Sequence, residues 1–143
     1  DLVSSRGLGD VYKRQEKIWD SSIANMGILF VNLYFRDRVP AYLDAIYPSF
    51  WRRELDIEDI DVVKRCLEAA GVESAGFDDF VNGEGRQMHD HILAHRFDAG
   101  MYGVPTYVLA EGVFFGREHL PYIRWVLTGK RGAAPDVGNE VVS

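Results

Sequence analysis

The sequence predicts a mixed α/β fold in which a mostly helical segment is followed by a β-hairpin and a C-terminal helix. Apolar residues recur at helical spacing through much of residues 20–100. The pattern changes at residues 104–116, VPTYVLAEGVFFG, which are rich in β-branched and aromatic residues. Residues 117–129, REHLPYIRWVLTG, return to a helical pattern.

Two consecutive helices are predicted at the start of the helical segment. The first covers residues 20–38, DSSIANMGILFVNLYFRDR, with an N-cap among residues 20–22 before a strongly apolar run. The second covers residues 39–55, VPAYLDAIYPSFWRREL, and has a broad aromatic face at helical spacing. Because Pro48 cannot donate a hydrogen bond to the carbonyl of Asp44, we expect a kink or a break there.

Three further helical segments follow. Residues 58–72, EDIDVVKRCLEAAGV, begin with acidic residues, carry one apolar face and end at Gly71. Residues 76–83, GFDDFVNG, predict a short helical turn, and residues 84–100, EGRQMHDHILAHRFDAG, predict another helix. The chain's single cysteine, Cys66, lies on an apolar helix face, so we expect a buried thiol and no internal disulfide.

The β-hairpin is predicted from its turn. Glu111 and Gly112 are placed as a tight turn between strands at residues 106–110 and 113–115. The helix predicted over residues 117–129 follows the second strand. Because an isolated two-stranded hairpin is not stable in water, we expect this one to join a larger sheet formed by residues upstream of the chain.

The N-terminal string SRGLGDVYKRQ, residues 5–15, has no apolar periodicity. It resembles the translated end of a DNA-sequencing adapter, so we expect residues 1–15 to be non-native and the protein's own sequence to begin near Glu16. The fold is then truncated, the C-terminal part of a longer protein. The expected domains are a helical insertion over residues 16–100, a ββα part over residues 101–130 and a tail over residues 131–143.

Composition excludes several kinds of partner. The chain has a net charge of −6 and no basic stripe, which argues against nucleic acid and anionic membrane surfaces. No uninterrupted apolar run reaches the roughly 20 residues that span a bilayer. We therefore expect a soluble protein that binds neither nucleic acid nor a membrane.

Residues 102–120, YGVPTYVLAEGVFFGREHL, carry a family resemblance. The stretch resembles the C-terminal end of the DsbA-like thioredoxin superfamily, and within it the 2-hydroxychromene-2-carboxylate isomerases and kappa-class glutathione transferases. The resemblance implies a thioredoxin-like fold interrupted by a helical insertion. It also implies a cytoplasmic homodimer that uses glutathione as co-substrate and acts on a small aromatic-derived acid.

The same resemblance implies a ligand site. A cis bond before Pro105 turns the backbone of Val104 outward as an open strand edge that pairs with glutathione. At the start of the last helix, Arg117 meets the carboxylate of the γ-glutamyl end and Glu118 meets its ammonium. The relatives usually have a small polar residue and an aspartate at these two positions. No catalytic residue can be named, because the nucleophile is expected upstream of Glu16, and the chain itself is expected to be inactive.

Two other functions stay open. A DsbA-family thiol–disulfide oxidoreductase uses the same proline loop beside an N-terminal Cys-x-x-Cys, and the two enzymes share every feature visible in this sequence. A helical binding module without chemistry would instead match its exposed apolar surface to a partner.

Two further patterns have simpler interpretations. His89, His91 and His95 lack the glutamate and the third ligand of a zinc site, so we favour an ordinary helix face and no metal. Aromatic residues at helical spacing are more often core than the lining of a substrate pocket. They are Trp19, Tyr34, Phe35, Tyr47, Phe50 and Trp51.

Overall fold

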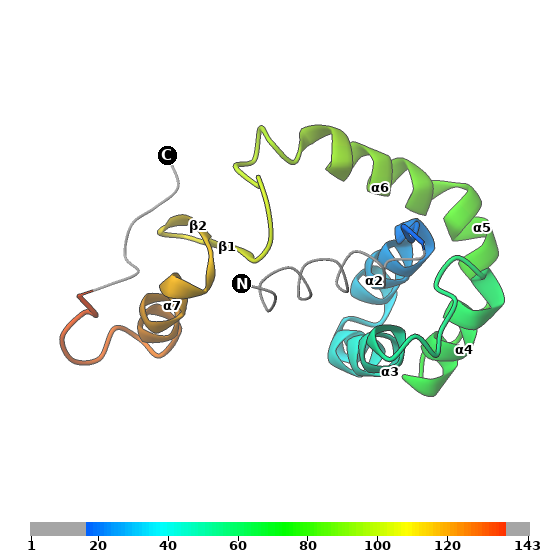
Figure 1. The fold of residues 1–143 in the computed structure, drawn as a ribbon, viewed down its shortest axis with the longest axis horizontal. Coiled ribbons are helices and arrows are strands. Elements are labelled where there is room, and N and C mark those ends of the chain that lie inside the picture. Colours follow the sequence, from blue (N-terminus) through cyan, green and yellow to red (C-terminus); the bar gives the residue numbers. More distant parts are fainter. Residues whose placement is uncertain (1–16, 137–143) are drawn as a thin grey trace, which may run out of the picture. The chain divides into compact units, whose positions relative to one another are not determined.

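The computed structural model describes residues 17–136, which divide after His89 into two compact units (Figure 1). Residues 1–15, expected to be non-native, lie outside the described residues, and so does the predicted tail from residue 137 onward. We call the unit before the division the helical unit and the unit after it the hairpin unit. In the part of the chain that the structure describes, no helix is both long and apolar enough to cross a bilayer.

The helical unit confirms the helices predicted in the first part of the chain. Helices α2, α3 and α4 contact one another, and α5 contacts α2 (Figure 1). Helix α6, Glu84–His95, begins in this unit and continues past the division. The other elements are α2 (Ser22–Tyr34), the 3₁₀ turn η1 (Arg36–Arg38), α3 (Val39–Trp51), α4 (Ile60–Ala69) and α5 (Phe77–Asn82).

The side chain of Asp20 caps the start of α2. Its Oδ1 accepts a hydrogen bond of 2.8 Å from the backbone N–H of Ser22 and another from the Ser22 hydroxyl. Both bonds lower the pKa of the Asp20 carboxyl, and the bond from the Ser22 hydroxyl has the larger effect. Ser21 occupies the N-cap position but its side chain makes no capping bond to the helix backbone, so the helix starts where predicted and is capped by the residue before it.

Of the kink or break expected at Pro48, the break is absent. Helix α3 continues through Pro48 to Trp51, so the expectation of a break was wrong. The carbonyl of Asp44 loses the hydrogen bond that a non-proline residue would donate, but Asp44 is exposed and water can take that place. The helix therefore tolerates the loss of one backbone hydrogen bond on its solvent-exposed side, within its last turns.

The core of the helical unit forms where the apolar faces of its helices meet. Cys66 is buried within it as predicted, and burial raises the pKa of its thiol. The buried apolar side chains are Met26, Phe30, Val31, Tyr42, Ile46, Ile57, Val63, Cys66, Leu67, Ala70, Val72, Phe77, Phe80 and Val81.

Tyr42 is a fully buried polar residue at the contact between α3 and α2. Its hydroxyl donates a 3.0 Å hydrogen bond to the carbonyl of Ala24, which satisfies the group inside the core. Burial raises the pKa of Tyr42 far above its usual value, because the phenolate would lose its hydration.

This burial predicts a loss of stability in alkaline solution. The unfolded chain releases the Tyr42 proton near pH 10 while the folded chain keeps it. Above that pH the folded state binds more protons, so the free energy of unfolding falls by up to about 1.4 kcal/mol per pH unit; below it, Tyr42 contributes no pH dependence. Urea denaturation at about pH 9 and about pH 11 should show a smaller loss for Tyr42→Phe than for the wild type. An equal loss in both proteins would contradict this assignment.

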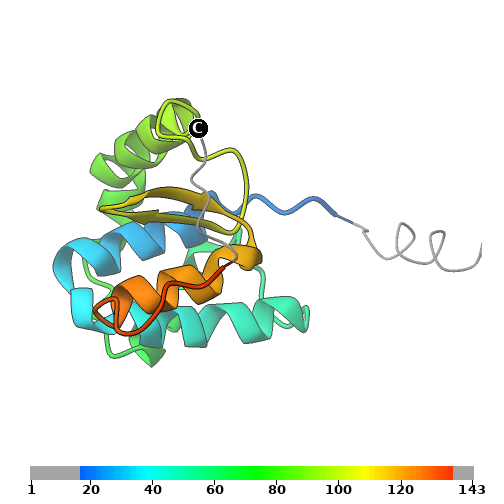
Figure 2. The ribbon, with the colours of Figure 1, turned by 90° about the vertical axis from the view of Figure 1, so that its left-hand side faces the viewer.

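The hairpin unit contains the end of α6, a two-stranded antiparallel hairpin and a final helix. Strand β1, Thr106–Leu109, pairs with β2, Gly112–Phe115. After the 3₁₀ turn η2, Arg117–His119, helix α7 covers Leu120–Leu127 and lies beside the hairpin (Figure 2). Phe114 of β2 is fully buried, and its ring centroid lies 5.4 Å from that of Tyr122 in α7.

The hairpin turn lies one residue earlier than predicted. The sequence places Glu111 and Gly112 in the turn, but Gly112 pairs with Leu109 as the first residue of β2, which leaves Ala110 and Glu111 as the connection. Gly112 has a φ of 144°. Glycine adopts this conformation at little energetic cost because it has no Cβ. The glycine therefore lies at the end of the turn and not at its centre.

Candidate functional site

The loop that enters β1 carries the first two predicted site residues. The Val104–Pro105 peptide bond is cis, as the resemblance led us to expect. The loop is held by Thr106, whose hydroxyl donates a 2.5 Å hydrogen bond to the carbonyl of Gly103. Gly103 has no room for a side chain, because a Cβ there would lie 2.8 Å from the ring of Phe115. This loop is thus packed against the end of β2.

Val104 presents an open backbone. The residue is 91% exposed, and no hydrogen bond links its N–H or C=O to the residues that the structure describes. A backbone N–H and C=O that are open to solvent can pair with an extended chain. The loop can therefore receive a peptide-like ligand through main-chain hydrogen bonds.

The start of the last helical segment lies beside this loop. The backbone N–H of Gly116 donates a 3.0 Å hydrogen bond to the carbonyl of Pro105. Arg117 follows Gly116 directly, so the hairpin brings all four predicted site residues to one end of the ribbon. Both Arg117 and Glu118 are exposed.

The Glu118 carboxylate folds back over Gly116. A Cβ on Gly116 would lie 2.6 Å from the carboxylate carbon of Glu118, so a side chain there would displace this carboxylate, and its φ of 99° favours glycine. One carboxylate oxygen lies 4.0 Å from Nε2 of the buried His119. The sequence did not single out His119, whose ring packs 5.5 Å from that of Phe114. The site thus offers an open backbone segment, one cation and one anion within a few residues.

Comparison with known proteins identifies the family. The model of the DSBA-like thioredoxin domain matches residues 11–127, most of the chain. The chain belongs to this family. Searches among curated proteins and among solved structures found no match.

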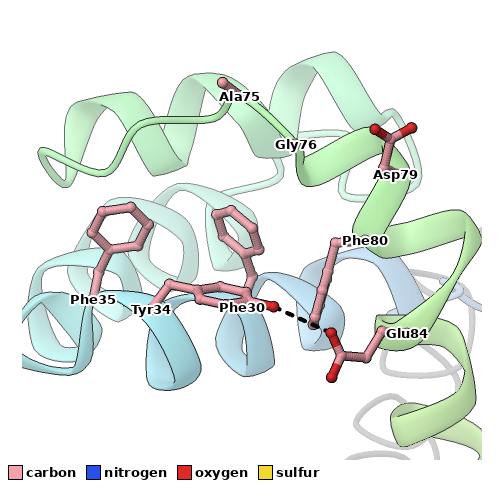
Figure 3. Close-up of a pocket in the computed structure, with 8 residues that line it drawn as sticks. All are labelled: Phe30, Tyr34, Phe35, Ala75, Gly76, Asp79, Phe80 and Glu84. Atoms are coloured by element: carbon pink, nitrogen blue, oxygen red, sulfur yellow. Dashed lines mark hydrogen bonds between the residues drawn. The ribbon is translucent and has the colours of Figure 1, made fainter.

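In this DSBA-like domain, the aromatic residues expected to be core are so only in part: Trp19, Phe35 and Phe50 pack partly buried against the core, whereas Tyr34, Tyr47 and Trp51 are exposed. All of them except Trp19 line one of two pockets of the helical unit. The larger pocket, about 500 Å³, is formed by side chains of α2, α5 and the start of α6 (Figure 3). The Tyr34 hydroxyl donates a 3.2 Å hydrogen bond to the Glu84 carboxylate, which raises the pKa of the tyrosine. The lining residues are Phe30, Tyr34, Phe35, Ala75, Gly76, Asp79, Phe80 and Glu84.

The second pocket, about 230 Å³, is lined in part by Tyr47, Phe50 and Trp51 of α3. The remaining member of the cluster, Trp19, packs edge-on against Phe50 with 5.8 Å between ring centroids. The sequence analysis did not single out Asp79 and Glu84, which also line the larger pocket. Their side chains join the larger pocket only through the packing of α5 and α6, so no local sequence pattern could have indicated them.

The three histidines do not gather. His89 is buried in the helical unit, whereas His91 and His95 are exposed on the later turns of α6. The rings of these two lie 4.2 Å apart, and Nδ1 of His95 is 2.9 Å from the carbonyl oxygen of His91. Within residues 17–136, no three histidine, cysteine, aspartate or glutamate side chains are placed to hold one metal ion.

Proposed function

We propose that this DSBA-like domain binds glutathione, as part of a glutathione-dependent isomerase or transferase that acts on small aromatic-derived acids. The hydrogen bond between Gly116 and Pro105 carries the proposal, because it fixes the open backbone of Val104 beside Arg117 and Glu118. A role for glutathione also agrees with a cytoplasmic location, since glutathione helps to keep the cytosol reducing.

Glutathione has the groups that this site would recognise. Its extended backbone can pair with the N–H and C=O of Val104 in the manner of an added strand. Its γ-glutamyl end carries a carboxylate and an ammonium on one carbon atom. The Arg117 guanidinium is suited to the carboxylate, and the Glu118 carboxylate to the ammonium, by charge-assisted hydrogen bonds.

The charged pair favours glutathione over a general disulfide-exchange role. A thiol–disulfide oxidoreductase needs a backbone edge for an extended peptide, which Val104 would provide, but it has no need for a zwitterion-binding pair. Activation of the glutathione thiol is assigned to no residue of this chain. The proposal is therefore one of ligand binding, with the reaction class taken from the family resemblance.

Titration of the ¹⁵N-labelled chain with reduced glutathione tests the proposal, since NMR shifts also detect weak binding. We expect the amide signals of Val104, Arg117 and Glu118 to move. Cysteinylglycine, which lacks the γ-glutamyl group and so loses both charge-assisted contacts, should bind more than tenfold more weakly, since one such contact is worth about tenfold. Arg117→Gln and Glu118→Gln should each weaken glutathione binding by a similar factor.

Arg124→Gln is the matched control, because Arg124 is an exposed arginine of α7 outside the proposed site. Its affinity for glutathione should equal that of the wild type. Equal binding of glutathione and cysteinylglycine, or glutathione shifts that avoid Val104, would overturn the proposal. Shifts produced equally by any cysteine peptide would favour the oxidoreductase alternative.

A further inference from the structure

We propose that the larger pocket of the helical unit binds a small organic cation, in which an ammonium group is carried on an aromatic or branched apolar body. This ligand is additional to glutathione, and its site uses none of the residues proposed to bind glutathione. The observation behind it is the juxtaposition of four aromatic rings with two carboxylates in a pocket of about 500 Å³.

The aromatic side of the pocket is built around Phe30. The Phe30 ring centroid lies 5.2 Å from that of Tyr34, 5.3 Å from Phe80 and 6.0 Å from Phe35. Phe30 and Phe80 are almost fully buried, whereas Tyr34 is 55% exposed. Figure 3 shows the rings at different inclinations around the opening. Such a group of rings offers π-faces, which attract cations, together with an apolar floor for the body of the ligand.

The charged residues of the pocket lining have one sign. Figure 3 shows the Glu84 carboxylate turned toward the Tyr34 hydroxyl, whereas Asp79 lies at the rim with its carboxylate directed away from the rings. Among the described residues that line the pocket there is no lysine, arginine or histidine. Tyr34 bonds one oxygen of Glu84, which orients the carboxylate beside an exposed ring. A cation over Tyr34 would therefore meet both the ring and a fixed negative charge.

The opening and the volume suit a small molecule. Pockets of roughly 300–1,000 Å³ are typical of small-ligand sites. Ala75 and Gly76 line the pocket with almost no side chain, and a Cβ on Gly76 would meet nothing within 4 Å. An aromatic acid would meet the like charge of Glu84 inside the pocket and that of Asp79 at its rim. The pocket thus selects against the substrates proposed for the glutathione reaction, which is why we assign it a different ligand.

Benzyltrimethylammonium is the probe, with benzyl alcohol and phenylacetate as the neutral and anionic comparisons. In NMR titrations of the full chain, we expect shifts at Tyr34, Phe80 and Glu84 and a Kd for the cation about fivefold or more below that of benzyl alcohol. Phenylacetate should bind most weakly. The double variant Asp79→Asn/Glu84→Gln should weaken binding of the cation about fivefold or more and change the Kd of benzyl alcohol by less than about twofold.

The matched control is Asp44→Asn/Glu73→Gln, which removes two exposed carboxylates of the same unit that do not line the pocket. This variant should bind the cation like the wild type. Equal affinities for the three probes, unchanged binding of the cation by Asp79→Asn/Glu84→Gln, or shifts absent from the pocket would each overturn the proposal. The outcome is read from residues of the helical unit, so it is distinguishable from success or failure of the glutathione titration at Val104.

Discussion

The Phe77→Ala variant is expected to lose about 3–5 kcal/mol of unfolding free energy, the range typical of a buried phenylalanine truncated to alanine. Phe77 is fully buried at the start of α5, and its ring centroid lies 5.4 Å from that of Phe30. Truncation removes this ring contact and leaves a cavity under α5. Urea denaturation followed by far-ultraviolet circular dichroism measures the loss.

Two comparisons keep the test informative. Phe77→Leu, which retains most of the buried volume, should lose clearly less, so a midpoint can be measured even where Phe77→Ala fails to fold. Phe97→Ala removes the same ring from a half-exposed position and should cost less than about 1 kcal/mol. A loss of similar size for Phe97→Ala and Phe77→Ala would show that Phe77 is not a core residue.

The Gly27→Ala variant is expected to lose about 1–3 kcal/mol, although alanine favours helices over glycine by about 1 kcal/mol. A Cβ on Gly27 would lie 2.7 Å from Cζ of Tyr42 and closer still to its hydroxyl oxygen. Tyr42 is fully buried and its hydroxyl is bonded to Ala24, so it cannot turn away without breaking that bond. The two helices must separate instead, and thermal or urea unfolding reports the cost.

Asn32→Ala, at an exposed position of the same helix, measures the gain in helix propensity without the contact to Tyr42. This control should be neutral or slightly stabilising. In a Tyr42→Phe background, Gly27→Ala should cost less, because the closest atom has been removed. The same cost in both backgrounds would mean that the effect of Gly27 does not arise from Tyr42.

Local sequence patterns were sufficient to predict the order of the helices and strands and the proximity of the four proposed glutathione-binding residues. Helical spacing, stop glycines and the change to β-branched residues at Thr106 each depend on near neighbours in the sequence. The four proposed glutathione-binding residues also belong to one short ribbon. Once strands form on either side of Glu111, Val104 and Arg117 come to the same end. Their proximity follows from the hairpin alone.

Features that depend on packing between distant helices could not be predicted in this way. The larger pocket joins Tyr34 to Glu84 across 50 residues, and its two carboxylates resemble ordinary surface charges in the sequence. Continuation of α3 through Pro48 depends on the exposure of Asp44, which is set by the side of the helix that faces α2 and α4. In each case the deciding contact lies outside the segment from which a pattern can be read.

The division of the chain after His89 also separates its tryptophans. Trp19 and Trp51 belong to the helical unit, and Trp125 belongs to the hairpin unit, where its indole N–H donates a 3.3 Å hydrogen bond to the carbonyl of Gly132. Trp51 is 75% exposed, whereas Trp19 packs against Phe50. Each unit therefore has its own fluorophore. The tryptophan emission of a Trp125→Phe chain comes from the helical unit alone, so tryptophan fluorescence can follow the unfolding of that unit separately from the other.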